Sequence, residues 1–376
     1  MAVDRAPNML ALHKRLLLKP DGRELILYAR AAFDEAALDL RHGVPAAGLR
    51  GPGLSHLRFH PLRGEWIVYA GHRQHRTFLP PPEWNPLAPS TDPKHPTEVP
   101  AGPWDVAVFE NLFSALGASP EVLPPRDLVP TAPCLGRTEV VVFTQDPTTS
   151  LGRLPLDHLD LVLAVWADRT AALGARDDVA YVFPFENRGT EVGVTLHHPH
   201  GQIYAYPFVP PIPARELELM GSHYAEHGRG LLADLIEGEI AASARTLVVT
   251  EHAIAWVPAF ARWAYEIWVA PRRAAPTLDG LTADERLDFA RALQLCLRKL
   301  DALWQRPMPY VLAIHQAPAK GEHPYAHVHL EIYPWLRMPG RQKYLAGSEV
   351  GAGAFTADTL PEEKAAELRA VEVEVT

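Results

Sequence analysis

The sequence predicts an α+β fold that contains one structural unit twice and has mainly antiparallel sheets. The main observation is a repeated order of elements, in which a helix, a strand and a loop lead to the pattern H-x-H-x-x-Ile-Tyr, first at 198–204 and again at 327–333. A shared order of flanking elements favours internal duplication over a chance match of two short motifs. The predicted strands come in hairpin-like pairs, which favours antiparallel sheets over a doubly wound parallel sheet.

The part of the chain before the first copy is predicted to consist mostly of strands and loops. Leu16-Leu17-Leu18 and Leu25-Ile26-Leu27-Tyr28 flank the turn Pro20-Asp21-Gly22, and this pattern is typical of a β-hairpin. The following segments are expected to be a linker at 30–53, a strand at 65–69, a basic loop at 72–76, an irregular proline-rich loop at 79–103, and strands at 105–109 and 138–144.

Each copy of the repeated unit begins with a predicted helix. In the first copy, apolar residues at helical spacing predict a helix near 156–173 with Gly174 as its cap, followed by a strand at 179–183. In the second copy, Thr282 and Glu285 form a capping-box pattern that begins the helix, and a strand follows at 310–314.

Length and composition limit the class of protein. A chain of 376 residues with 47% apolar content is long enough for two domains or one large α/β body. The net charge of −9 argues against a general nucleic-acid binder, and only two cysteines, far apart, argue against a disulfide framework. The absence of a long apolar run and of a signal-peptide pattern at the start predicts a cytoplasmic location without a membrane partner.

The first H-x-H copy, His198-Pro199-His200-Gly201-Gln202, predicts phosphorus chemistry. On an extended segment both imidazoles point to one face. A neutral His200 is the candidate nucleophile, which would attack phosphorus to form a phosphoramidate, and the Gln202 amide would donate to a phosphate oxygen without acting as an acid. Gly201 would let a phosphate approach the backbone closely. The alternative is that these are strand histidines that pack against a sheet.

Other groups of residues suggest ligand sites. His315, His327 and His329 have the pattern of metal ligands, which a carboxylate such as Glu216 would complete, although several acids would serve and all three histidines would also suit a surface. Arg73 and Arg76 would clamp a diphosphate, or belong to a solvated loop. Two further candidates are Asn187, after the strand at 179–183, and the glycine-rich stretch 347–355 with Glu349. The alternatives are a turn closed by the Asn187 side chain and a plain flexible loop at 347–355.

Several segments together resemble the galactose-1-phosphate uridylyltransferase family, in the nucleotide-transferring branch of the histidine-triad superfamily. The similarity runs over most of residues 55–370. Besides H-P-H-G-Q, it rests on Phe59-His60-Pro61-Leu62-Arg63-Gly64-Glu65-Trp66, His72-Arg73-Gln74-His75-Arg76, Val108-Phe109-Glu110-Asn111, Phe185-Glu186-Asn187-Arg188-Gly189 and Lys343-Tyr344-Leu345-Ala346-Gly347-Ser348-Glu349.

The resemblance implies two tandem histidine-triad-like domains and a ping-pong reaction of galactose metabolism, the Leloir pathway. UDP-glucose would uridylylate His200 and release glucose 1-phosphate, and galactose 1-phosphate would then leave as UDP-galactose. We expect an N-terminal hairpin and linker at 1–50, an N-terminal domain at 51–213 and a C-terminal domain at 214–376. The alternatives are a related nucleotidyl transferase or phosphorylase with another acceptor or base, and a metal-containing nucleotide-binding protein without turnover.

The resemblance also implies roles for individual residues. His200, Gln202 and His198 would form the catalytic group, and Lys343 and Glu349 would face the sugar phosphate. The nucleotide would be held by Arg73, Arg76, Phe109, Asn111, Phe185, Asn187, Thr195 and Gln202. One divalent metal per chain, zinc or alternatively iron, would be bound by Glu216, His315, His327 and His329. The family is a homodimer, which implies a second copy of the chain as partner.

The chain also departs from the family pattern. Many members have a second metal site made of a C-x-x-C pair, a distant histidine and the first histidine of H-P-H. Here the aligned positions are Asn85-Pro86-Leu87-Ala88 and Pro147, so only His198 remains. Because such sites need about four ligands, we expect this site to be empty and hydrogen bonds to replace the metal. Leu112, Ser348 and Phe355 stand where ribose or sugar contacts are common, which leaves the choice of sugar open.

Overall fold

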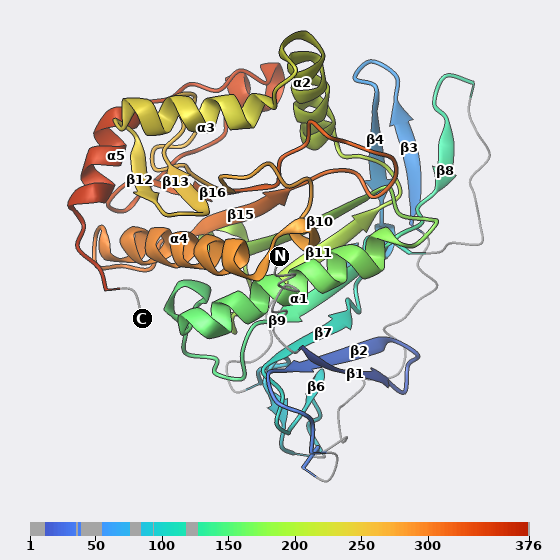
Figure 1. The fold of residues 1–376 in the computed structure, drawn as a ribbon. Coiled ribbons are helices and arrows are strands. Elements are labelled where there is room, and N and C mark those ends of the chain that lie inside the picture. Colours follow the sequence, from blue (N-terminus) through green and yellow to red (C-terminus); the bar gives the residue numbers. More distant parts are fainter. Residues whose placement is uncertain are drawn as a thin grey trace, which may run out of the picture.

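A single antiparallel sheet of 11 strands forms the centre of the molecule (Figure 1). The computed structural model describes residues 12–34, 37–38, 55–75, 84–92, 94–117 and 127–374. In the central sheet the strand order is β1-β2-β7-β9-β11-β10-β15-β16-β14-β13-β12, and every neighbouring pair is antiparallel. The α+β prediction is confirmed, and both repeats share this one sheet.

The elements have the following bounds. The central strands are β1 (His13–Leu18), β2 (Glu24–Ala29), β7 (Val106–Glu110), β9 (Arg137–Val142), β10 (Tyr181–Arg188), β11 (His200–Tyr206), β12 (Thr246–Val249), β13 (Ala253–Trp256), β14 (Ile267–Pro271), β15 (Tyr310–His315) and β16 (His329–Pro334). The helices are α1 (Leu156–Gly174), α2 (Pro211–His227), α3 (Leu231–Ala242), α4 (Ala283–Ala302) and α5 (Pro361–Ala370).

Shorter elements complete the described chain. A three-stranded sheet contains β3 (His56–His60), β4 (Glu65–Tyr69) and β8 (Thr131–Pro133). Two short strand pairs are β5 (Pro89–Ser90) with β6 (Val99–Pro100) and β17 (Leu336–Met338) with β18 (Arg341–Gln342). The single-turn helices are η1 (Gly71–His75), η2 (Leu151–Arg153), η3 (Thr190–Val192), η4 (Leu278–Gly280) and the π-turn η5 (Gly347–Ala352).

The strand order supports the predicted duplication. Counted outward from the centre of the sheet, the first half has the order β10-β11-β9-β7-β2 and the second half has β15-β16-β14-β13-β12. In each half a long helix, α1 or α4, leads into the innermost strand, which is followed in sequence by the strand of the H-x-H motif. The halves meet where β10 pairs with β15, with Phe185 opposite Ala313 and Arg188 opposite Tyr310.

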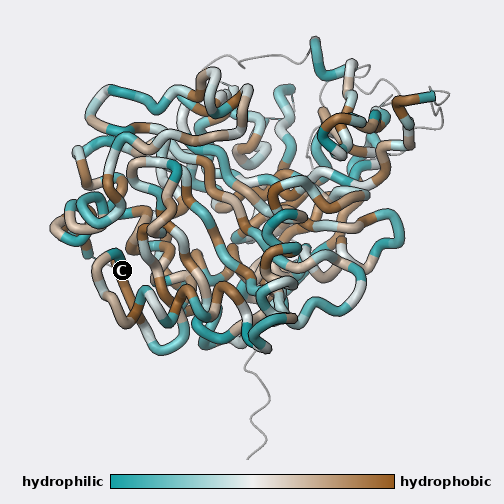
Figure 2. The backbone as a smooth tube through the Cα atoms, turned by 90° about the horizontal axis from the view of Figure 1, so that it is seen from above, coloured by the Kyte–Doolittle hydropathy of each residue, from teal (hydrophilic) through white to brown (hydrophobic). Residues whose placement is uncertain are grey.

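Helices α1 and α4 run side by side over one face of the sheet and form the main core with it (Figure 1). Apolar residues of these helices, such as Trp166 and Phe289, are fully buried against strand residues such as Ile203 and Ile332. Figure 2 shows that hydrophobic segments gather in the interior and hydrophilic ones in the outer loops. In the second half, α2 and α3 cover the other face through a cluster that includes Trp256 and Trp268.

Several local predictions are confirmed and others need correction. The hairpin is formed by β1 and β2, and α4 begins with the predicted capping box, in which Glu285 N–H donates to Thr282 Oγ1 at 3.3 Å. Gly174 is the last residue of α1 and not its cap, since the chain stays right-handed at Ala175. Strand β10 extends to Arg188, so Asn187 lies in the strand and not in the loop after it.

Other features were not predicted or lie outside the described residues. Helices α2, α3 and α5 have no counterpart in the sequence prediction, and most of the expected linker at 30–53 lies outside the described residues. Cys134 and Cys296 are buried free thiols. In the described parts of the chain, no helix combines the length and the apolar character needed to cross a membrane.

Candidate active site

The first H-x-H motif leads into β11, which lies between β9 and β10. Buried and half-buried residues alternate along this strand. Ile203 and Ala205 belong to the core under α1 and α4, so His200 and Gln202 point to the opposite face of the sheet. The strand therefore places the candidate nucleophile and its amide neighbour on the same face.

A hydrogen bond to the backbone fixes the proton on His200. Its Nδ1 lies 2.7 Å from the carbonyl oxygen of His198. A carbonyl only accepts, so Nδ1 carries the hydrogen and Nε2 keeps a lone pair when the ring is neutral. Burial lowers the pKa of His200, against the smaller raising effect of this hydrogen bond. The ring is therefore neutral near pH 7, which is the state that a nucleophilic imidazole requires.

His198 is held at both ring nitrogens. Nε2 lies 2.7 Å from the carbonyl oxygen of Thr144, and Nδ1 lies 2.9 Å from Nδ2 of Asn85. Burial lowers the pKa of His198, although the Thr144 hydrogen bond and the charge of Asp146 act in the opposite direction. Asn85 is the first residue of the segment that aligns with the C-x-x-C pair of the family pattern. At this aligned position the chain therefore has a side chain that hydrogen-bonds to His198.

A cavity of about 460 Å³ opens beside the two histidines. Its lining includes His198, His200 and Asn187, together with the arginines Arg153 and Arg306. Arg306 is paired with Glu191 at 2.6 Å. The cavity is large enough for part of a nucleotide sugar, and its lining contains both arginines and the acids Glu186 and Glu191.

Gly201 has a reason for being glycine that the sequence did not suggest. A Cβ atom at this position would lie 2.7 Å from Cζ of Phe143 and 3.0 Å from the carbonyl oxygen of Phe185. Phe143 is fully buried and packs edge-on against Trp166. Close packing inside the sheet is thus one reason for this glycine, and the expected approach of a phosphate to the backbone stays a prediction.

The candidate nucleotide contacts occupy different surroundings. Phe185 of β10 lies opposite Gln202 in the strand pairing, and its ring packs against Tyr204. The Asn111 side chain accepts the Phe113 N–H at 2.9 Å and so closes a turn. Phe109 is 3% exposed and lies in a core cluster of the first half, so its predicted contact with the nucleotide stays a prediction.

The remaining candidates of this group lie in loops. Arg73 belongs to η1, which is held by His72 Nε2 at 3.0 Å from the carbonyl oxygen of Ser114. Thr195 lies between η3 and β11. Arg76 lies outside the described residues.

Lys343 and Glu349, predicted to face the sugar phosphate, lie near each other. Lys343 Nζ is 4.0 Å from Glu349 Oε1 and donates to the carbonyl oxygen of Thr356 at 2.6 Å. Glu349 accepts backbone N–H groups of Ala346 and Thr356, at 3.2 and 3.4 Å, and these backbone hydrogen bonds lower its pKa. The sequence left a flexible loop as one alternative for the stretch 347–355. In the structure this stretch contains the ordered turn η5.

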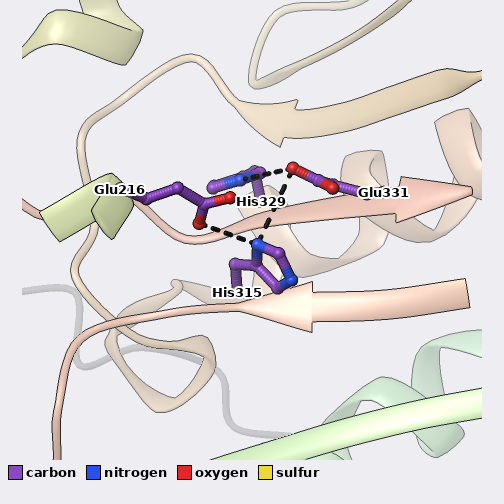
Figure 3. Close-up of side chains that lie close together, drawn as sticks. All are labelled: Glu216, His315, His329 and Glu331. Atoms are coloured by element: carbon purple, nitrogen blue, oxygen red, sulfur yellow. Dashed lines mark hydrogen bonds and ion pairs between the residues drawn. The ribbon is translucent and has the colours of Figure 1, made fainter. Parts of the chain in front are cut away.

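The second half contains a cluster of four ligand side chains (Figure 3). His315 ends β15, His329 and Glu331 lie on β16, and Glu216 approaches from α2. His315 Nδ1 is 2.8 Å from Glu216 Oε2 and 3.7 Å from Glu331 Oε1, and His329 Nε2 is 3.3 Å from the same Glu331 oxygen. One ligand atom from each of the four residues lies within 4.8 Å of all the others.

The surroundings of this cluster favour a cation. Burial alone would lower the pKa of His315, but the charges of Glu331 and Glu216 and the hydrogen bond to Glu216 outweigh it and raise the pKa to about 9. Two imidazoles and two carboxylates are a donor set that suits zinc in fourfold coordination. The residues present therefore fit one divalent metal ion.

His327 is not brought into this cluster. Its Nε2 lies 2.8 Å from the carbonyl oxygen of Pro271, while Nδ1 is buried and has no hydrogen-bond partner in the part of the chain that the structure describes. Glu331 was missed as a candidate, although the repeat contained the signal. Aligning His198-Pro199-His200-Gly201-Gln202 with His327-Val328-His329-Leu330-Glu331 puts this carboxylate at the position of Gln202.

Comparison with known proteins places the chain in a family. Residues 49–210 match the family described as "Galactose-1-phosphate uridyl transferase, N-terminal domain", and residues 216–375 match its C-terminal domain. The galactose-1-phosphate uridylyltransferase of Thermotoga maritima is 35% identical over 85% of this chain and 99% of its own length. The enzyme of that name from Streptomyces lividans is 37% identical over 79% of each chain.

Solved structures agree with this assignment. A chain described as "Structure of uridylyltransferase" superposes with a TM-score of 0.76 at 34% identity, covering 84% of this chain and 98% of the other. An ADP-glucose phosphorylase from Arabidopsis thaliana has the same fold at 23% identity, with a TM-score of 0.64, and covers 85% of this chain and 99% of its own. Since the two family domains together span nearly all of the sequence, this chain belongs to the galactose-1-phosphate uridylyltransferase family.

Proposed function

We propose that this chain is a UDP-glucose–hexose-1-phosphate uridylyltransferase of galactose metabolism that works through a uridylyl-His200 intermediate. The observation that carries the proposal is the His200 ring, whose Nδ1 donates to the His198 carbonyl so that Nε2 is left as the reactive atom. Gln202 extends from the same face of β11. Membership of the family supplies the substrate class.

The reaction has two displacements at one phosphorus. In the first, His200 Nε2 forms a bond to the α-phosphorus of UDP-glucose, and the bond from that phosphorus to the bridging oxygen breaks. Glucose 1-phosphate leaves with the electron pair. In the second, a phosphate oxygen of galactose 1-phosphate attacks the same phosphorus, the P–N bond breaks, and UDP-galactose leaves with His200 neutral again.

Different groups of the site have different proposed tasks. The Gln202 amide donates to the oxygens of the transferring phosphorus, where a neutral donor stabilises developing charge. Asn187 and Phe185 on β10, Asn111, Thr195, Arg73 and Arg76 surround the uridine and the phosphates. Lys343 and Glu349 contact the sugar phosphate, with Lys343 supplying the positive charge.

A single divalent metal, zinc in preference to iron, is proposed for the second half. Glu216, His315, His329 and Glu331 would hold it, with His327 as a further ligand if its unpartnered Nδ1 turns toward the cluster. The metal would tie α2 to β15 and β16 and would supply no step of the reaction. We further propose a homodimer, a cytoplasmic location and a division of the chain at 51–213 and 214–376.

Intact mass spectrometry tests the proposal. After incubation with UDP-glucose alone, the wild-type mass is expected to increase by one UMP, and His200→Ala is expected to gain nothing. Adding individual sugar 1-phosphates or phosphate then shows which acceptor removes the adduct. An adduct that survives in His200→Ala would refute the nucleophile, and an adduct formed only from ADP-glucose, or removed only by phosphate, would favour a related transferase or phosphorylase.

A further inference from the structure

The Asn85 side chain connects an N-terminal loop to the active-site histidines. We propose that Asn85 is a positioning residue that keeps His198 Nδ1 free of hydrogen and, together with Thr144, anchors His198, whose backbone carbonyl holds His200 with its Nε2 toward the substrate. The inference deepens the proposed function and rests on it for the role of His200. It concerns a residue that does not touch the reacting atoms.

The orientation of the Asn85 amide follows from its own loop. Its Oδ1 accepts the N–H of Leu87 at 3.1 Å, and its backbone carbonyl accepts the N–H of Ala88 at 3.2 Å. The loop is anchored further by Glu98, whose N–H donates to the carbonyl of Pro86 at 2.9 Å. With Oδ1 occupied by a donor, the atom that faces His198 is Nδ2, which can only donate.

A donor at this position determines the proton on His198. Asn85 Nδ2 lies 2.9 Å from His198 Nδ1, so Nδ1 has to be the acceptor and carry no hydrogen. Nε2 then carries the hydrogen and donates it to the Thr144 carbonyl at 2.7 Å. His198 is 3% exposed, so water has little access to exchange these partners. Both ring nitrogens are satisfied only in this neutral tautomer.

The fixed His198 in turn holds the nucleophile. Its backbone carbonyl accepts the Nδ1 hydrogen of His200 at 2.7 Å. Two hydrogen bonds therefore lead from Asn85, through His198, to the ring that would attack phosphorus, and a third anchors His198 to Thr144. The two ring contacts restrain the residue whose backbone carbonyl sets both the tautomer and the direction of His200.

The second repeat is an internal comparison. There His329 Nδ1 lies 3.0 Å from the His327 carbonyl, and His327 Nε2 lies 2.8 Å from the carbonyl of Pro271, so the backbone contacts are the same. What differs is His327 Nδ1, which is buried and has no partner among the described residues. Among the described residues, the side-chain donor is present only in the repeat that carries the candidate nucleophile.

Few charged groups compete with Asn85 for the state of His198. The charge of Asp146 favours the protonated ring, but Asp146 is engaged by the N–H and the hydroxyl of Thr148, at 2.8 and 2.7 Å. His200 lies on the other side, and its own protonation is disfavoured by burial. The Thr144 carbonyl requires the hydrogen on Nε2, and the Asn85 amide excludes a second hydrogen on Nδ1, so the two groups together hold the His198 ring neutral.

The substitution Asn85→Asp tests this directly. Aspartate keeps an acceptor for the Leu87 N–H but presents an acceptor, not a donor, to His198 Nδ1, which then has to be protonated. In ¹⁵N spectra of the histidine-labelled full chain, wild-type His198 is expected as the neutral Nε2–H form at pH 7, and Asn85→Asp is expected to carry both protons. Because the chain has 18 histidines, the His198 signals are assigned as those missing from His198→Gln.

The same variant has an expected effect on the half-reaction. Formation of the UMP adduct is expected to slow about 10- to 100-fold at pH 7, since misplacing a reacting group costs rate on this scale. In a plot of the rate of UMP adduct formation against pH, the acidic limb is expected to move to higher pH. As a matched control, Thr97→Val removes a hydrogen bond to the Ala88 carbonyl in the same loop and should change neither the His198 signals nor the profile.

The outcomes are distinguishable. A wild-type His198 that carries its hydrogen on Nδ1 overturns the inference without any variant. So does an Asn85→Asp protein with unchanged His198 signals and an unchanged profile, or a Thr97→Val protein that reproduces the change. If wild-type protein takes up no UMP, the proposed function fails, while the nitrogen signals still decide the tautomer.

Discussion

At the scale of single residues, the two repeats show how one position changes the chemistry of a histidine pair. In both copies the second histidine donates through Nδ1 to the carbonyl of the first, at 2.7 and 3.0 Å. Two residues further on, the first copy has the neutral Gln202 and the second has Glu331, which attracts His315 and His329. A carboxylate favours a cation, whereas an amide tolerates an anionic phosphate.

Replacement of this amide by an acid is therefore informative. In Gln202→Glu a negative charge would face the phosphate oxygens, and loss of one such donor slows related reactions by about 10² to 10³. We expect the rate of UMP adduct formation to fall by that factor while the unfolding temperature changes little. If this variant forms the adduct at the wild-type rate, Gln202 does not belong to the catalytic group.

A second residue-scale prediction concerns Gly201. Gly201→Ala would push a methyl group against Phe143 and the Phe185 carbonyl, and overpacking of this kind destabilises by about 1–3 kcal/mol. Urea unfolding should show this loss. The matched control is Gly238→Ala in α3, where no atom lies within 4 Å of the new methyl group and alanine should stabilise the helix by about 0.5–1 kcal/mol. Equal effects of the two changes would contradict the packing argument.

At the scale of elements, the boundary between β10 and β15 contains a buried acid. Glu186 of β10 accepts a hydrogen bond from the Tyr310 hydroxyl of β15 at 2.8 Å, and Glu186 is 3% exposed. Burial raises the pKa of Glu186 from 4.5 to about 7, although the Tyr310 hydrogen bond and Arg188 act against it. The acid is therefore protonated in the folded protein at mildly acidic pH.

This pKa predicts how stability depends on pH. Between pH 4.5 and about 7 the folded chain holds a proton that the unfolded chain has lost, so the contribution of Glu186 to stability falls as pH rises. Glu186→Gln lacks this loss. Relative to wild type, its free energy of unfolding should increase by up to about 3 kcal/mol between pH 5 and pH 8. Urea titrations at both pH values measure this difference, and a difference that does not vary with pH would contradict it.

At the scale of the whole molecule, the continuous sheet joins the two repeats into one cooperative body. Residues 185–188 pair directly with residues 310–313, so neither half can separate without exposing unpaired strand edges. Buried contacts between α1 and α4, such as Arg286 with Asp160 at 2.8 Å, add to this connection. We therefore expect the chain to unfold in a single transition.

Metal removal tests this coupling. Elemental analysis should find about one metal ion per chain, and chelation should lower the unfolding temperature because the ion binds the folded state. The single transition should shift as a whole, although the ligands lie in the second half. Glu216→Gln should show a smaller shift on chelation. Two separate transitions, or about two ions per chain, would contradict this picture.

Local signals made part of the molecule predictable from the sequence. The capping box of α4, the N-terminal hairpin and the H-x-H strands depend on neighbouring residues, and the structure contains them. Helices α2 and α3 were missed: α2 begins at Pro211 and has few buried residues, and both depend on packing against Trp256 and Trp268. The role of Gly201 and the approach of Glu331 to His315 arise from pairing between distant strands, which one sequence without an alignment does not specify.

The mirrored strand order at the centre of the sheet has an evolutionary consequence. The edge strands β10 and β15 of the two halves pair antiparallel at the centre of the sheet. An isologous contact between two identical half-length chains would produce the same arrangement. In such an ancestral assembly every substitution would appear on both sides of the symmetry axis at once. Covalent fusion would end that constraint and would leave one His-x-His step free to acquire the amide proposed for phosphate transfer and the other free to acquire the carboxylate proposed for a metal.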